Sequence, residues 1–141
     1  MLVENIIIHH AGVEDGPTAQ WGAIRKYHIE HNGWRDIGYH AGCELIGDHD
    51  EVLQGRPWTM DGAHTIGMND KALGFCFVGD FNEMPPPYEQ IDAGAVMIRE
   101  WLRLYNLAPK DIHPHRRFSS TDCPGKDFDW GYLMWAVKQN V

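Results

Sequence analysis

The sequence of 141 residues has no long apolar run and few basic residues. No segment approaches the roughly 20 consecutive apolar residues that a membrane-spanning helix needs, so we expect no membrane span. Twelve Lys and Arg residues stand against twenty Asp and Glu residues, which gives a net charge of −8. Because binding to nucleic acid depends on clustered positive charge, this balance argues against a nucleic-acid partner.

Cysteine is also scarce, and the three cysteines are Cys43, Cys76 and Cys123. An odd number without a signal sequence indicates reduced thiols and not a disulfide framework. The N-terminus, MLVENIIIHH, lacks the basic region of a signal peptide, and Glu4 precedes its short apolar run. We interpret that run as a strand. We therefore expect the protein to be made in the cytoplasm without its own signal peptide.

The length fits one domain, and no repeat, low-complexity tract or linker divides it. The helix predicted over 88–107 is the clearest element, because apolar residues recur at helical spacing from Ile91 to Tyr105. The alternation of predicted strands and helices indicates an α/β fold. Strands are predicted at 4–10, 36–46, 51–56, 71–81 and 112–115, and helices at 17–32, 88–107 and 126–139.

Cys123 lies in a polar loop, SSTDCPG, whereas a buried core cysteine would normally lie in an apolar run. His9 and His115 each end a predicted strand, and open α/β sheets place their sites at strand ends. Two imidazoles and a thiolate are a plausible zinc ligand set, and a fourth position left for water makes such a site catalytic. Two alternatives stay open here: His9 as a core histidine, and His113 in place of His115, because residues two apart on a strand share a face.

His10 follows His9 along the strand, so it points to the opposite face and is interpreted as structural. Two other interpretations of His9, His115 and Cys123 remain. A thiol hydrolase would use Cys123 as its nucleophile and His115 or His9 as its base. A structural zinc protein is the other alternative, although no fourth ligand is evident.

Five motifs occur in order along the chain: IIIHHAG, GWRDIGYH, GAHTIGMN, LGFCFVGDF and HRRFSSTDCPG. Together they resemble the zinc-dependent N-acetylmuramoyl-L-alanine amidases of the type 2 family, over roughly residues 4–135. That family includes phage amidase endolysins and peptidoglycan recognition proteins. The resemblance implies a central mixed β-sheet flanked by helices. It also implies that residues 1–141 form a single catalytic domain with no separate cell-wall-binding domain.

The resemblance further implies a ligand set for one Zn²⁺ per chain. The first histidine of HH is His9, the histidine of HR is His115, and the cysteine before PG is Cys123. This selects His115 over His113. The retained cysteine favours an enzyme, because non-catalytic recognition proteins usually lose it.

Four more site residues follow from the same resemblance. Tyr39, of GYH, is expected beside the metal as a catalytic residue, and Thr121 is expected to reach the site two residues before the cysteine ligand. His64 and Asn69, of GAHTIGMN, are expected to bind substrate. Cys76 stands at about the position where a related branch has a catalytic glutamate, which places this chain in the tyrosine branch.

The implied activity is hydrolysis of the amide bond between N-acetylmuramic acid and L-alanine in peptidoglycan. We expect a monomeric phage or prophage endolysin that acts on the cell wall after release from the host cytoplasm. A cytoplasmic wall-recycling enzyme and a non-catalytic peptidoglycan-binding module are the alternatives. The sequence does not decide whether Trp34 and Trp58 line the substrate groove or pack in the core.

Overall fold

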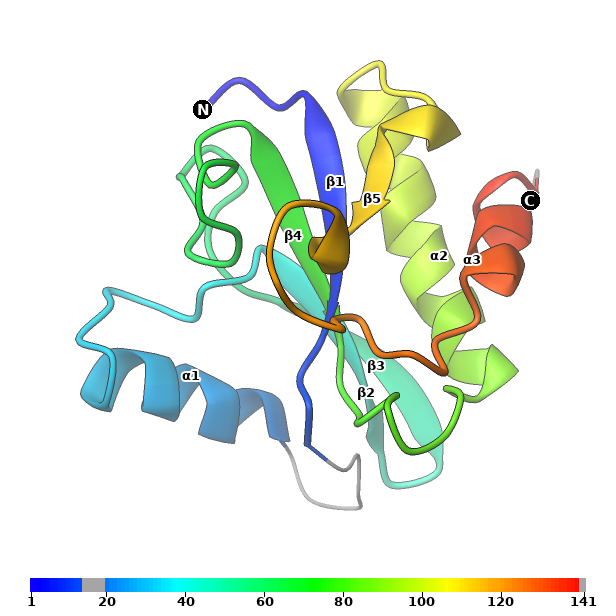
Figure 1. Ribbon diagram of the computed structural model, residues 1–141, viewed down its shortest axis with the longest axis horizontal. Coiled ribbons are helices and arrows are strands. Elements are labelled where there is room, and N and C mark those ends of the chain that lie inside the picture. The colour runs from blue at the N-terminus through cyan, green and yellow to red at the C-terminus, as the bar shows by residue number, and fades with distance from the viewer. Residues whose placement is uncertain (14–19, 140–141) are drawn as a thin grey trace.

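The five strands of the computed structural model form one mixed sheet in the order β3-β2-β4-β1-β5, in a structure that describes residues 1–13 and 20–139 (Figure 1). All neighbouring strands are parallel except the β2–β3 hairpin. This confirms the predicted α/β fold with a mixed central sheet. The strands are β1 (Asn5–His10), β2 (Ala41–Ile46), β3 (His49–Gln54), β4 (Ala72–Phe77) and β5 (Ile112–Pro114).

Helices lie on both sides of this sheet (Figure 1). Helix α2 (Tyr88–Leu104) contacts β2, β3 and β4, and it also packs against α3 (Trp130–Val137). Helix α1 (Gln20–Glu30) contacts β2 from the other side. Two short 3₁₀ helices, η1 (Pro109–Asp111) and η2 (His115–Arg117), flank β5.

The two faces of the sheet bury different kinds of side chain. Ile6 and Ile8 of β1 belong to the large apolar core between the sheet and α2. Because successive side chains of a strand alternate between faces, His9 points to the α1 side, where Trp21 and Cys76 form a smaller cluster. The face that carries α1 therefore has a buried imidazole in place of an aliphatic side chain.

The strand predicted over 36–46 begins only at Ala41, so its first five residues were assigned wrongly. Asp36 makes an ion pair with Arg25 of α1 at 2.6 Å, and its carboxylate also accepts the backbone N–H of Ile37. The Gly38 N–H then donates to Nδ1 of His28. These local contacts hold residues 36–38 in a turn against α1.

The helix predicted over 126–139 is observed over Trp130–Val137, and its start is fixed by Asp129, whose side chain accepts the Tyr132 N–H at 2.9 Å as an N-cap. The N–H of Lys126 donates to the side chain of Asn82, and that of Asp127 donates to the carbonyl of Phe81. At the other end of the sequence, the predicted helix 17–32 is observed over Gln20–Glu30, and residues 17–19 lie outside the described residues.

A buried carboxylate holds α1 on the sheet. Glu44 of β2 is fully buried, and it accepts the backbone N–H groups of Gln20 at 2.7 Å and Trp21 at 3.2 Å. These N–H groups belong to the first turn of α1, where no intrahelical acceptor exists. Glu44 therefore caps this helix from a neighbouring strand.

We expect Glu44→Ala to lower the free energy of unfolding by about 1–3 kcal/mol, because buried N–H groups lose their acceptor. Urea denaturation followed by circular dichroism measures this. Glu30→Ala, at an exposed position of the same helix, should change stability by less than about 0.5 kcal/mol. Equal effects of the two substitutions would contradict the capping role of Glu44.

Among the helices of residues 1–13 and 20–139, none combines the length and the apolar character needed to cross a lipid bilayer.

Candidate metal centre

Three side chains predicted as metal ligands lie together on the α1 side of the sheet. His9, His115 and Cys123 each place one ligand atom within 4.8 Å of the others. Nδ1 of His9 lies 3.8 Å from Sγ of Cys123, and the rings of His9 and His115 have centroids 4.5 Å apart. Ligand atoms around a tetrahedral zinc ion are about 3.3–3.6 Å apart. The donor types and their spacing therefore fit zinc with small adjustments.

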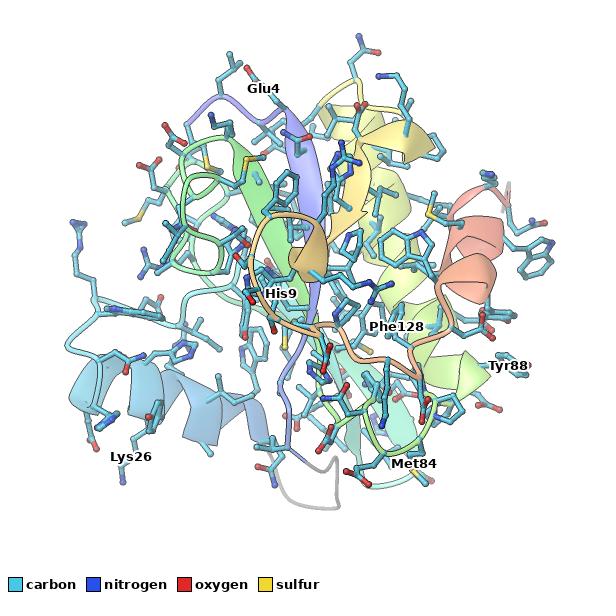
Figure 2. All side chains as sticks on the ribbon, viewed as in Figure 1. Glu4, His9, Lys26, Met84, Tyr88 and Phe128 are labelled. Atoms are coloured by element: carbon cyan, nitrogen blue, oxygen red, sulfur yellow. The ribbon has the colours of Figure 1, made fainter. Side chains whose placement is uncertain are left out.

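The register of the sheet brings the two histidines together. Ile8 of β1 pairs with Pro114 of β5, so the next residues, His9 and His115, lie side by side. His113 pairs with Ile7, one step earlier, and its Nε2 lies 3.2 Å from Oδ1 of Asn5. The geometry places His115, and not His113, beside His9. Figure 2 labels His9 near the centre of the molecule, behind the loop that follows β5.

The loop that carries Cys123 is tied to its neighbours through backbone contacts. The His10 N–H donates to Sγ of Cys123 at 3.3 Å, and the Arg116 N–H donates to the Cys123 carbonyl at 2.9 Å. Gly125 has a φ of +113°, and a Cβ there would lie 2.5 Å from the carbonyl carbon of Phe81. Only glycine fits this conformation and this close approach, which explains the glycine of the CPG sequence.

Burial sets the protonation of the cluster. It lowers the pKa of His9 well below 6.5, and the neighbouring His64 and His115 lower it further. The imidazole of His9 is therefore neutral at pH 7 and keeps a lone pair for a metal. Burial also raises the pKa of the Cys123 thiol to about 11. A nucleophilic cysteine needs a lowered pKa, so this environment disfavours the thiol hydrolase, whereas a bound cation would stabilise the thiolate.

Tyr39 precedes β2 and packs against the ligand cluster. Its ring centroid lies 5.1 Å from that of His9 and 6.2 Å from that of Trp21. Burial, followed by the thiols of Cys76 and Cys123, raises the pKa of Tyr39 well above 10. The phenol therefore stays protonated at neutral pH and can act as a hydrogen-bond donor.

A cavity of about 600 Å³ adjoins the cluster and is lined by the predicted site residues His64, Asn69, His115 and Thr121, together with Trp34. Thr121 is exposed, and its hydroxyl oxygen accepts the Cys123 N–H at 3.1 Å. Its place at the cavity wall suits contact with a bound substrate.

The two tryptophans that the sequence left open take different places. Trp34 lines this cavity. Trp58 packs edge-on against the core residue Trp101, with ring centroids 5.6 Å apart.

A second cavity, of about 660 Å³, lies between the β2–β3 hairpin and the start of α2. Its lining is acidic and apolar, with Asp50, Glu83 and Met84 among its residues, and it includes none of the predicted site residues. We assign the functional site to the cavity of about 600 Å³ because His64 and His115 line it, whereas neither histidine lines the cavity beside α2.

The sequence did not indicate that a third imidazole would contact one of the predicted metal ligands. Nε2 of His9 lies 3.0 Å from Nδ1 of His64, and the buried hydroxyl of Thr65 lies 2.9 Å from the same His64 atom. No residue pattern signals this contact, and its one trace in the sequence is the pair of glycines Gly62 and Gly74, in GAHTIGMN and LGFCFVGDF, which are explicable only from the structure. Each leaves room for the His64 ring.

Comparison with known proteins places this geometry in context. Residues 1–126 match the family model described as N-acetylmuramoyl-L-alanine amidase. Peptidoglycan-recognition protein SC2 of Drosophila melanogaster is 33% identical over 137 residues, which cover 92% of this chain and 72% of that protein.

Solved structures of bacterial proteins share the fold over nearly the whole chain. N-acetylmuramoyl-L-alanine amidase LysC from Clostridium intestinale superposes with a TM-score of 0.83 at 27% identity, covering 99% of this chain and 87% of that one. The endolysin amidase LysCS of the same organism gives a TM-score of 0.82 at 28% identity, covering 99% and 86%.

Proposed function

The chain belongs to the N-acetylmuramoyl-L-alanine amidase family, and from this premise we propose that it is a zinc-dependent peptidoglycan hydrolase. The proposed reaction cleaves the amide bond that joins N-acetylmuramic acid to L-alanine. The observation that carries the proposal is the convergence of His9, His115 and Cys123 beside a cavity large enough for a muropeptide segment.

The proposed ligands suit the chemistry that the reaction needs. An amide is a poor electrophile and water is a poor nucleophile. Bound zinc supplies Lewis acidity, which makes the amide carbonyl more electrophilic and water more acidic. His9, His115 and Cys123 would hold the ion, and such a set of two imidazoles and one thiolate is typical of catalytic zinc sites.

The other residues act on the substrate through hydrogen bonds. The Tyr39 hydroxyl keeps its proton at neutral pH and is the proposed donor to the oxyanion that develops on the scissile carbonyl oxygen. The Thr121 hydroxyl does not ionise, so it serves to orient the carbonyl or the attacking water at the cavity wall.

Product identification on purified peptidoglycan tests the proposed reaction. We expect each cleavage to release a new L-alanine amino terminus and to leave the lactyl carboxylate on intact glycan strands, which mass spectrometry detects. New reducing sugar ends, or amino terminals from within the stem peptide, would contradict it.

Chelation tests the metal requirement separately. Treatment with 1,10-phenanthroline should reduce hydrolysis to background, and added Zn²⁺ should restore it, because the Lewis acid is removed and replaced. Turbidity loss of purified cell walls measures both steps. Activity that survives chelation but is lost on thiol alkylation would instead indicate a thiol hydrolase.

A binding module that recognises peptidoglycan without cleaving it is the second candidate, because a relative is named for recognition. Its signature would be sedimentation of the protein with insoluble cell walls and no cleavage at any zinc concentration. The intact ligand triad favours the enzyme.

We also propose that the protein works as a monomeric endolysin that reaches the wall after release from the cytoplasm. The similarity to an endolysin amidase supports this role. Expression in the cytoplasm should leave cells intact until the membrane is permeabilised, and lysis should follow at once. Lysis without permeabilisation would contradict the proposed route.

A further inference from the structure

The imidazole of His9 is engaged on both edges. Nδ1 lies 3.8 Å from Sγ of Cys123, on the side of the ligand cluster, and Nε2, on the opposite edge (here called the inner edge), lies 3.0 Å from Nδ1 of His64. His9 is 2% exposed, so water does not compete for the inner edge. The inner contact joins β1 to the loop before β4.

The proton positions of this contact follow from a backbone carbonyl. Nε2 of His64 lies 3.2 Å from the carbonyl oxygen of Ala72, which only accepts hydrogen bonds, so Nε2 of His64 carries a proton. Because a neutral imidazole has one donor and one acceptor, Nδ1 of His64 is an acceptor. Nε2 of His9 must then be the donor, which leaves the lone pair of His9 on Nδ1.

The hydroxyl of Thr65 is compatible with this assignment. Its oxygen lies 2.9 Å from Nδ1 of His64 and 3.4 Å from Nε2 of His9. A hydroxyl can donate and accept at once, so Thr65 can share the single lone pair of His64 Nδ1 with His9 and accept part of the His9 N–H, and neither contact moves the proton from Nε2 of His9.

The His64 ring packs tightly against the backbone at two glycines. A Cβ at Gly62 would lie 2.5 Å from Cδ2 of His64, and a Cβ at Gly74 would lie 2.6 Å from the same atom. The side chain of Asn69 accepts the backbone N–H groups of His64 at 2.8 Å and Thr65 at 2.9 Å. Two glycines and one asparagine thus hold a single imidazole against His9.

We propose that His64 is a positioning residue for the metal centre. The Ala72 carbonyl holds the proton of His64 on Nε2, and the unprotonated Nδ1 of His64 in turn holds the proton of His9 on its Nε2. The lone pair of His9 Nδ1 is thereby aimed at the ion, and the hydrogen bond at Nε2 strengthens it as a ligand. This inference rests on the proposed function, which supplies the ion. It gives His64 a role through His9, in addition to its place in the cavity wall.

Nuclear magnetic resonance of the metal-free wild-type protein tests the proton positions directly. With ¹⁵N-labelled histidine, we expect protonated Nε2 and unprotonated Nδ1 on both His9 and His64, and a scalar coupling across the hydrogen bond between the two rings. A proton on Nδ1 of either ring would overturn the proposal, and this result does not depend on any variant folding.

Zinc affinity of His64 variants, measured by competition with a chromogenic chelator, tests the consequence. His64→Leu has no acceptor and should bind zinc about 10–100-fold more weakly. His64→Asn places an amide oxygen near the position of Nδ1 and should recover most of the affinity. His64→Gln places its amide near the position of Nε2 instead and should remain weak.

Unchanged zinc affinity in His64→Leu, or equal affinity in the leucine and asparagine variants, would overturn the inference. A loss of substrate affinity alone, with zinc affinity intact, would show that His64 only contacts substrate. Circular dichroism verifies that each variant is folded. If wild-type protein binds zinc and cleaves peptidoglycan while these variants behave like it, only this inference fails. If wild-type protein binds no zinc, the proposed function fails.

Discussion

Cys123→Ala is expected to lose both zinc and hydrolysis. The substitution removes the one proposed sulfur ligand, and the two remaining imidazoles would not make a zinc site of ordinary stability. Zinc content should fall from one ion per chain to near zero. Hydrolysis should fall by at least about 10³-fold, since a Lewis acid contributes several kcal/mol to the transition state. Elemental analysis and turbidity loss of cell walls measure the two effects.

Two matched controls separate ligand loss from damage to the fold. Cys43→Ala also removes a buried thiol, but Cys43 lies in the large core beside α2, so this variant should keep its zinc. His115→Ala should behave like Cys123→Ala, whereas His113→Ala, two residues away, should keep zinc and activity. Loss of zinc in both controls, or its retention in Cys123→Ala, would contradict the assigned ligand set.

Tyr39→Phe is expected to keep zinc and lose most of the rate. The substitution removes only the hydroxyl, while the ring that packs against His9 and Trp21 remains. Loss of one donor to a developing oxyanion typically lowers kcat by about 10²–10³-fold. Steady-state kinetics on a soluble muropeptide, together with zinc analysis of the same sample, measure the effect.

Tyr27→Phe is the control for Tyr39→Phe, because Tyr27 is an exposed residue of α1. It should retain wild-type kcat. If Tyr39→Phe were also fully active, the hydroxyl would have no catalytic role. If it lost zinc, Tyr39 would be a structural neighbour of the ligands and not a donor to the substrate.

The sheet and the longest helix were predictable because their residue patterns match their burial. The apolar run of β4 is buried throughout, as expected for a central strand covered on both faces. Ile91, Ala95, Ile98 and Leu102 of α2 are buried at the spacing that the sequence indicated. Element ends were less predictable, since they depend on partners distant in sequence, such as Asn82 for Lys126 and Phe81 for Asp127.

The prediction of the ligand set relied on the family resemblance to choose His115 over His113. Residue spacing alone could not separate His115 from His113, because the answer lies in the pairing of β5 with β1, where Pro114 lies beside Ile8. The alternation of strand side chains did predict that His10 would face away from His9. In the structure, Nδ1 of His10 accepts the Phe81 N–H at 3.1 Å.

The contact between His9 and His64 could not be predicted from the sequence. The two residues are 55 positions apart, and a hydrogen bond between imidazoles has no residue pattern of its own. The glycines that make room for His64 are explicable only once the ring is seen against β4. Long-range contacts of this kind require the structure.

X-ray absorption at the zinc edge of the zinc-loaded protein identifies the atoms bound to the ion. We expect one sulfur at about 2.3 Å, two imidazole nitrogens at about 2.0–2.1 Å and one further light atom that exogenous ligands can replace. A zinc ion without a sulfur neighbour, or with a full set of four protein ligands, would contradict the proposed ligand set.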